Sequence, residues 1–198
     1  MNTQTTPSHA SARALSRLLS VAGALATAAL LSACGSMASP GHNPYSQVNV
    51  PPAVQVPTGH KVAMETVGVG EITYECRDKA GTMGQTEWAF VGPKAVLNDR
   101  SGKAVGSYYG PPATWESTDG SRLTGTQVAV APAGMGNIPY QLVKANPAVG
   151  AGAMTGVSYI QRVALKGGAA PAAMCSTSNK GERQTVKYQA DYIFWKAA

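Results

Sequence analysis

Short stretches of alternating apolar and polar residues recur along most of the chain beyond residue 70, and Gly, Pro, Asp and Asn separate them. Alternation with a period of two predicts half-buried β-strands, and the β-branched and aromatic residues in these stretches favour the same structure. We expect strands at residues 71–76, 87–91, 103–109, 123–130, 140–144, 157–165 and 185–195. The pattern therefore predicts an all-β single domain, folded as an antiparallel sandwich or barrel.

The clearest of these expected strands is residues 185–195. One of its faces is apolar or small throughout: Val186, Tyr188, Ala190, Tyr192 and Phe194. The other face begins polar but becomes apolar at Ile193 and Trp195. The strand thus offers one face to a core along its whole length and a second apolar face only near its end.

An earlier apolar run, residues 21–31, has a different pattern. It is uninterrupted, follows Arg13 and Arg17, and is shorter than the roughly 20 residues that a membrane-spanning helix needs. This layout is typical of a secretory signal. The run closes in Leu31-Ser32-Ala33-Cys34, which resembles the lipobox of bacterial lipoproteins. The resemblance implies a signal peptide at 1–33 and lipidation of Cys34.

Such a lipid would anchor the protein in the bacterial cell envelope, so we expect the membrane to be a partner. Several acyl chains on Cys34 give a stable anchor, because each buried CH₂ contributes about 0.8 kcal/mol. Gly35 stands where an inner-membrane retention signal has Asp, which favours the periplasmic leaflet of the outer membrane. The alternative is an ordinary signal peptide cut near Ala33, with Cys34 left as a free thiol.

The mature chain divides into two parts. Residues 34–57 hold the lipidated Cys34 and five prolines but no Asp, Glu, Lys or Arg, so we expect an extended tether. Residues 58–198 are long enough for one domain with its own core.

Two further cysteines remain, Cys76 and Cys175. An even number of cysteines in an oxidising compartment is consistent with a disulfide. Cys76 shares the expected inner face of its strand with Ile72 and Tyr74, and Cys175 lies in a Gly/Ala/Pro-rich loop that can fold onto it. A redox-active or metal-binding pair would instead need C-x-x-C spacing or a nearby His, and the sequence has neither. A structural disulfide is the favoured interpretation.

The charges and histidines exclude several functions. The chain has 16 basic and 10 acidic residues, but no Lys or Arg run interleaved with aromatics, so a nucleic-acid partner is not expected. His60 is the one His of residues 58–198, expected as an exposed residue beside the first strand. The sequence lacks the residues needed for a nucleophilic triad, for a metal site and for a phosphate-binding glycine loop. We therefore expect no metal or cofactor.

One segment retains candidate chemistry. Tyr108, Tyr109 and Trp115 cluster around Gly110-Pro111-Pro112, and exposed aromatic faces suit a glycan or an extended peptide. Glu116 and Asp119 flank a turn beside Trp115 and are the local candidates for a carboxylate pair. The structural alternative places Trp115 and Tyr109 in a core, Glu116 in solvent and Asp119 in a hairpin turn.

Several motifs together resemble the DUF3455 family of uncharacterised secreted or envelope proteins. They are Gly70–Cys76 with Trp88-Ala89-Phe90, Thr114-Trp115-Glu116 with Asp119-Gly120-Ser121, Tyr159-Ile160-Gln161-Arg162, Gly167-Gly168 with Pro171 and Cys175, and Tyr188 to Phe194. The resemblance implies no activity. We therefore expect an envelope-anchored, non-enzymatic binding or structural domain, and the alternative is a polysaccharide hydrolase that uses Glu116 and Asp119.

Overall fold

The computed structural model describes residues 45–198 of the chain. The expected signal peptide and the candidate lipidation site Cys34 lie outside the described residues. Within residues 45–198, no helix has the length and hydrophobicity needed to cross a membrane.

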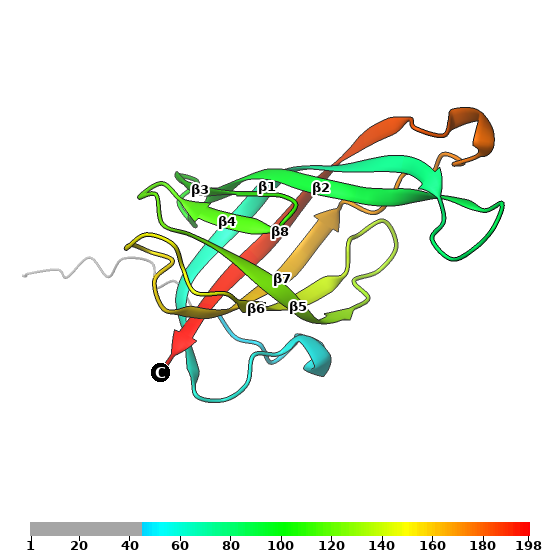
Figure 1. Cartoon of the computed structure of the whole chain (residues 1–198). Helices are drawn as coiled ribbons and strands as arrows, with labels where there is room; N and C mark the ends of the chain where they lie inside the picture. Colours follow the sequence, from blue (N-terminus) through cyan, green and yellow to red (C-terminus); the bar gives the residue numbers. More distant parts are fainter. Residues whose placement is uncertain (1–44) are drawn as a thin grey trace, which may run out of the picture. The chain divides into compact units, whose positions relative to one another are not determined.

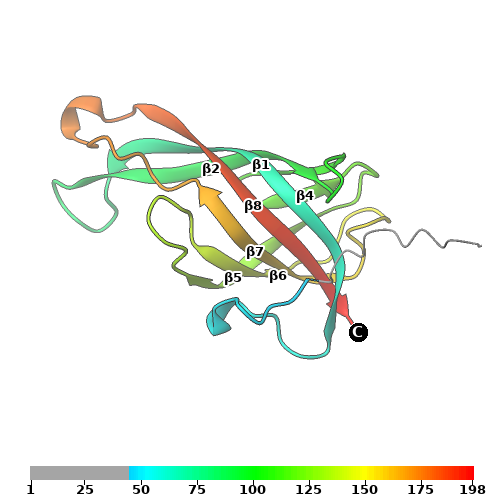
Figure 2. The ribbon, with the colours of Figure 1, turned by 180° about the vertical axis from the view of Figure 1, so that it is seen from behind.

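The described part is a closed barrel of eight antiparallel strands (Figure 1). Each strand pairs with the next along the chain, and β8 pairs with β1 to close the sheet, as the view from behind also shows (Figure 2). The strands are β1 (His60–Asp78), β2 (Thr86–Asn98), β3 (Ala104–Tyr109), β4 (Thr114–Ser117), β5 (Arg122–Ala131), β6 (Tyr140–Ala145), β7 (Val157–Gly167) and β8 (Arg183–Ala197). The all-β prediction is confirmed, and of its two architectures the barrel is the one observed.

Every expected strand overlaps an observed one, but β1 and β2 are much longer than predicted and β4 was missed. Gly70 and Gly92 interrupt the alternation, although both lie inside strands. A Cβ atom at Gly70 would overlap the Lys94 carbonyl oxygen, and one at Gly92 would overlap the Gly110 carbonyl oxygen. These glycines therefore serve close backbone approach rather than turns.

Aromatic side chains fill the interior of the barrel. The ring of Tyr108 stacks on that of Trp115 at a centroid distance of 4.6 Å, and Tyr192 packs against both. Gly68 makes room for this group, because a Cβ atom there would lie 2.6 Å from the Tyr192 ring. Burial raises the pKa of the Tyr192 hydroxyl, which lies 3.1 Å from the hydroxyl of Tyr188. The interior is thus a packed core.

Residues 45–57, which we call the strap, cover part of the outer surface. Val50, Val54 and Val56 of the strap are buried in a second core with apolar residues of β5–β8, including Ile193 and Trp195. This contact explains why the outward face of β8 becomes apolar near its end. The prediction of an extended tether through Pro57 is therefore wrong for residues 45–57, which include the short helix η1 (Pro52–Val54).

Gln161 of β7 fixes the position of the strap. Its side chain is fully buried, and its Nε2 donates hydrogen bonds to Gln47 Oε1 (3.0 Å) and to the Val54 carbonyl (2.7 Å). The hydroxyl of Tyr45 donates to Gln161 Oε1 (2.8 Å). Because a buried amide is costly to leave unpaired, these bonds favour one register of the strap on the barrel.

Candidate functional site

The predicted aromatic cluster is divided between the two faces of the sheet. Tyr108 of β3 and Trp115 of β4 are direct cross-strand partners, 5% and 1% exposed, and both belong to the interior core. Their ring faces are therefore not accessible to a glycan or peptide. Tyr109 points the other way, as the alternation of a strand requires, and is 38% exposed.

Tyr109 and Glu116 come together on the outer surface. The Tyr109 hydroxyl donates a hydrogen bond of 2.6 Å to Glu116 Oε2. This bond to a carboxylate raises the pKa of Tyr109. Of the five predicted surface residues, these two form a contact that holds an exposed aromatic ring in one orientation.

Asp119 instead has a structural role in the turn between β4 and β5. Its Oδ1 accepts hydrogen bonds from the backbone N–H and the hydroxyl of Ser121, and its Oδ2 accepts one from the Ala153 N–H. These bonds, led by the one from the Ser121 hydroxyl, lower the pKa of Asp119 from 3.8 to about 2. A glycosidase acid needs a raised pKa, so the arrangement gives the Glu116–Asp119 hydrolase hypothesis no support.

The same bonds predict an acid-sensitive contribution to stability. The folded pKa of Asp119 is below its unfolded value, so its contribution is present above about pH 4 and is lost as the pH falls toward about 2. We expect Asp119→Asn to be less stable at neutral pH and to lose less stability across that interval. Urea unfolding at several pH values measures both effects, with Glu87→Gln on β2 as the control. Parallel curves for Asp119→Asn and the wild type between pH 4 and 2 would contradict the assignment.

The expected disulfide is present. Cys76, at 0% exposure near the end of β1, is bonded to Cys175 in the loop between β7 and β8, with a Cα–Cα distance of 5.4 Å. Two hydrogen bonds hold the same loop. Thr86 Oγ1 donates to the Cys175 carbonyl (2.8 Å), and Trp88 Nε1 donates to the Ala173 carbonyl (2.7 Å). The crosslink therefore braces one end of the barrel.

His60 is half-buried rather than fully exposed. Its ring meets the ring of Tyr159 edge to face at 4.9 Å, and its Nδ1 lies 3.0 Å from the Pro57 carbonyl. Among residues 45–198, no group of three or more His, Cys, Asp or Glu side chains is placed to hold a metal ion.

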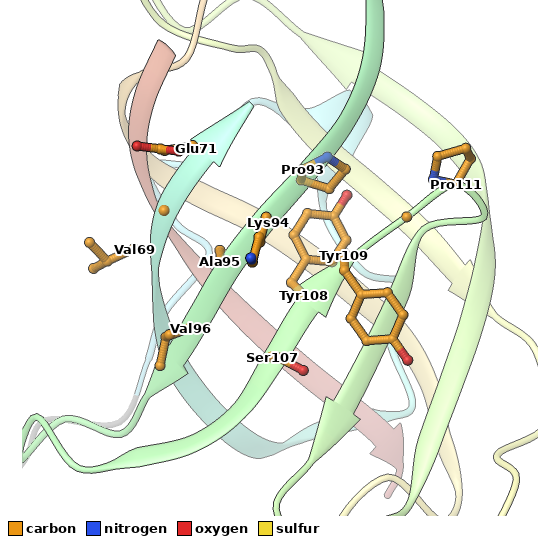
Figure 3. Close-up of a pocket in the computed structure, with 12 residues that line it drawn as sticks. Val69, Glu71, Pro93, Lys94, Ala95, Val96, Ser107, Tyr108, Tyr109 and Pro111 are labelled. Carbon is orange, nitrogen blue, oxygen red and sulfur yellow. The ribbon is translucent and has the colours of Figure 1, made fainter. Parts of the chain in front are cut away.

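A groove of about 840 Å³ lies on the outer face of β1, β2 and β3 (Figure 3). Its walls are mostly apolar, and they include Val69 and Val96, each 47% exposed, with Pro93, Tyr109 and Pro111. Sequence reasoning found Tyr109 but missed the two valines, which lie in the parts of β1 and β2 that were not predicted. The sequence signal that could have placed Val69 on the outer face is the alternation of Val67, Val69 and Glu71.

The strand register arranges the outward side chains in two rows across the sheet. One row runs from β3 to β8: Tyr109, Lys94, Glu71 and Lys187. The second row runs from β3 to β7: Ser107, Val96, Val69, Gln189 and Lys166. The first groove shares Val69, Gly70 and Glu71 with a second one of about 440 Å³ over β8, so the two form one continuous surface.

These features define a closed antiparallel barrel with a filled interior, a disulfide-braced end and an elongated outer groove. The family model described as "Protein of unknown function (DUF3455)" matches residues 57–196, and the chain belongs to this family. The resemblance seen in the sequence motifs is thereby confirmed. No curated protein and no solved structure matches the chain. Nearly all of the strap precedes the matched region.

Proposed function

We propose that this protein is an envelope-anchored lipoprotein whose barrel is a non-enzymatic binding module, and that the outer groove is its binding surface. The observation that carries the proposal is the contrast between the two faces of the sheet. The interior is occupied by Trp115, Tyr108 and Tyr192, whereas the outer face of β1–β3 leaves Val69 and Val96 half-exposed in a groove of about 840 Å³. Exposed apolar surface of this kind is typical of binding sites.

The proposed location has two supports. The disulfide between Cys76 and Cys175 suits an oxidising compartment outside the cytosol. The lipobox-like sequence before Cys34 supplies the anchor. The barrel would then be held near the membrane that carries the lipid.

One experiment with two arms tests the proposal on the full chain in cells. In the first arm, a clickable palmitate analogue should label the wild type but not Cys34→Ala. In the second arm, photo-crosslinking groups placed at Val96 on β2 and at Lys144 on β6 compare the groove with another part of the outer surface. We expect discrete crosslinked species from position 96 that position 144 does not give. Absence of label would refute the anchor, and identical crosslinking patterns would refute the groove.

A further inference from the structure

The two grooves adjoin along β1, and one is mainly apolar whereas the other is mainly basic. The apolar part lies over β1–β3, where Val69, Val96, Pro93 and Pro111 provide most of the wall. The basic part lies over β8 and the adjoining end of β7, where Lys166 and Lys187 line it with Gln189. The two grooves together cross five neighbouring strands in the order β3, β2, β1, β8 and β7. Since neighbouring strands are about 4.8 Å apart, this track is about 19 Å long. A ligand that fills the track meets mostly apolar side chains and Lys94 over β1–β3, and Lys166 and Lys187 at the far end.

Basic residues outnumber acidic residues along this track. Lys94, Lys166 and Lys187 face the groove with one carboxylate, Glu71, which lies between Lys94 and Lys187 in the register. None of the three lysines forms an ion pair within the described part of the chain. Ion pairs do form elsewhere on the outer surface, as in the bonds of Arg100 to Glu65 and Asp191. The groove therefore retains a positive excess.

Other extended ligands fit this surface less well. A peptide that adds a strand needs an open sheet edge, but β1 is already paired with β2 and β8. A neutral glycan needs several exposed aromatic faces. Of the three aromatic residues of this segment, Tyr108 and Trp115 are buried, so Tyr109 alone offers an exposed ring. Mostly apolar walls over β1–β3, with the unpaired ammonium groups of Lys166 and Lys187 over β7 and β8, complement a molecule with a hydrocarbon chain and a negative head group.

From this complementarity we infer that the groove binds a single-chain amphiphile with an anionic head, such as a long-chain carboxylate. This inference rests on the proposed function, since it names the ligand class of the same groove. The chain lies over Val69 and Val96, and the head group contacts Lys166 and Lys187. Since exposed ion pairs are weak, we expect removal of both lysine charges to weaken binding about threefold to tenfold.

The test compares two photoactivatable probes on the full chain in its membrane: a fatty acid and the alcohol of the same chain length. The fatty acid should label the groove peptides several-fold more than the alcohol does. Lys166→Gln with Lys187→Gln should remove that preference, whereas Lys144→Gln on β6 should retain it. Val69→Ser should weaken labelling by both probes, which separates the apolar contribution from the charge.

The outcomes distinguish the inference from the proposed function. Equal labelling of the groove by the two probes, or an unchanged preference in the double lysine variant, would overturn the anionic head group while leaving the groove as a binding site. Crosslinks from position 96 to a peptide or glycan, with no labelling by either probe, would overturn the amphiphile and retain the binding module. Failure of both the probes and the position-96 crosslinks would overturn both.

Discussion

Replacing Trp115 by alanine is expected to lower the free energy of unfolding by about 3–5 kcal/mol. Trp115 is 1% exposed, stacks on Tyr108 and meets Tyr192 at its edge, so its removal leaves a large cavity in the middle of the barrel. Strands that are hydrogen-bonded on both sides cannot move inward to fill that cavity. The loss should therefore lie in the upper range for a core substitution.

Trp115→Phe separates the ring from its N–H group. Within the described residues, Trp115 Nε1 has no hydrogen-bond acceptor, so phenylalanine removes an unsatisfied buried donor while it keeps an aromatic ring against Tyr108. We expect a smaller loss than in the alanine variant, because the cavity is smaller and no hydrogen bond is broken. Trp88→Phe is the useful contrast, since Trp88 Nε1 donates to the Ala173 carbonyl.

Urea unfolding followed by circular dichroism measures these effects without depending on tryptophan fluorescence. Tyr109→Ala is the matched control: the residue adjoins Tyr108 in sequence but faces outward, and its loss should cost about 1 kcal/mol or less. Similar losses in Trp115→Ala and Tyr109→Ala would contradict the division of this segment between inner and outer faces.

That division shows what a local pattern can and cannot establish. Alternation identified β8 well, and its inward residues Tyr188, Tyr192 and Phe194 are all buried. The prediction of one exposed aromatic cluster was wrong because it grouped Tyr108 with Tyr109. These two residues are neighbours in sequence, so their side chains lie on opposite faces of a strand. Placing Trp115 required β4, a strand of four residues that is too short to give a periodic signal.

The strap and the groove were beyond sequence reasoning for a different reason. The strap has the composition of a tether, and its three buried valines become meaningful only once Ile193, Trp195 and other apolar residues form an outer surface to receive them. The groove is assembled from five strands, and its rows depend on register. A shift of one residue would exchange Val69 for Gly68 on the outer face. Such relations are properties of the closed sheet rather than of any segment.

The disulfide was predictable because it depends on residue count and compartment rather than on register, and its removal gives the second large effect expected. Cys76 and Cys175 are 99 positions apart, and a crosslink that closes a loop of this length stabilises a fold by up to about 4.7 kcal/mol in the chain-entropy model. We expect Cys76→Ala with Cys175→Ala to lose about 2–5 kcal/mol. Alanine suits position 76, because that site is fully buried and a serine would bring an unpaired hydroxyl into it.

Two measurements separate the crosslink from the local packing. In urea, the double variant should unfold at a lower concentration and with a steeper dependence, because its uncrosslinked unfolded chain exposes more surface. Hydrogen exchange should increase in the loop that contains Cys175, which then depends on the bonds from Thr86 and Trp88. Met174→Ala, at the exposed neighbour of Cys175, should leave both quantities unchanged. If the double variant and the wild type unfold at the same urea concentration without reductant, the bond does not brace the barrel.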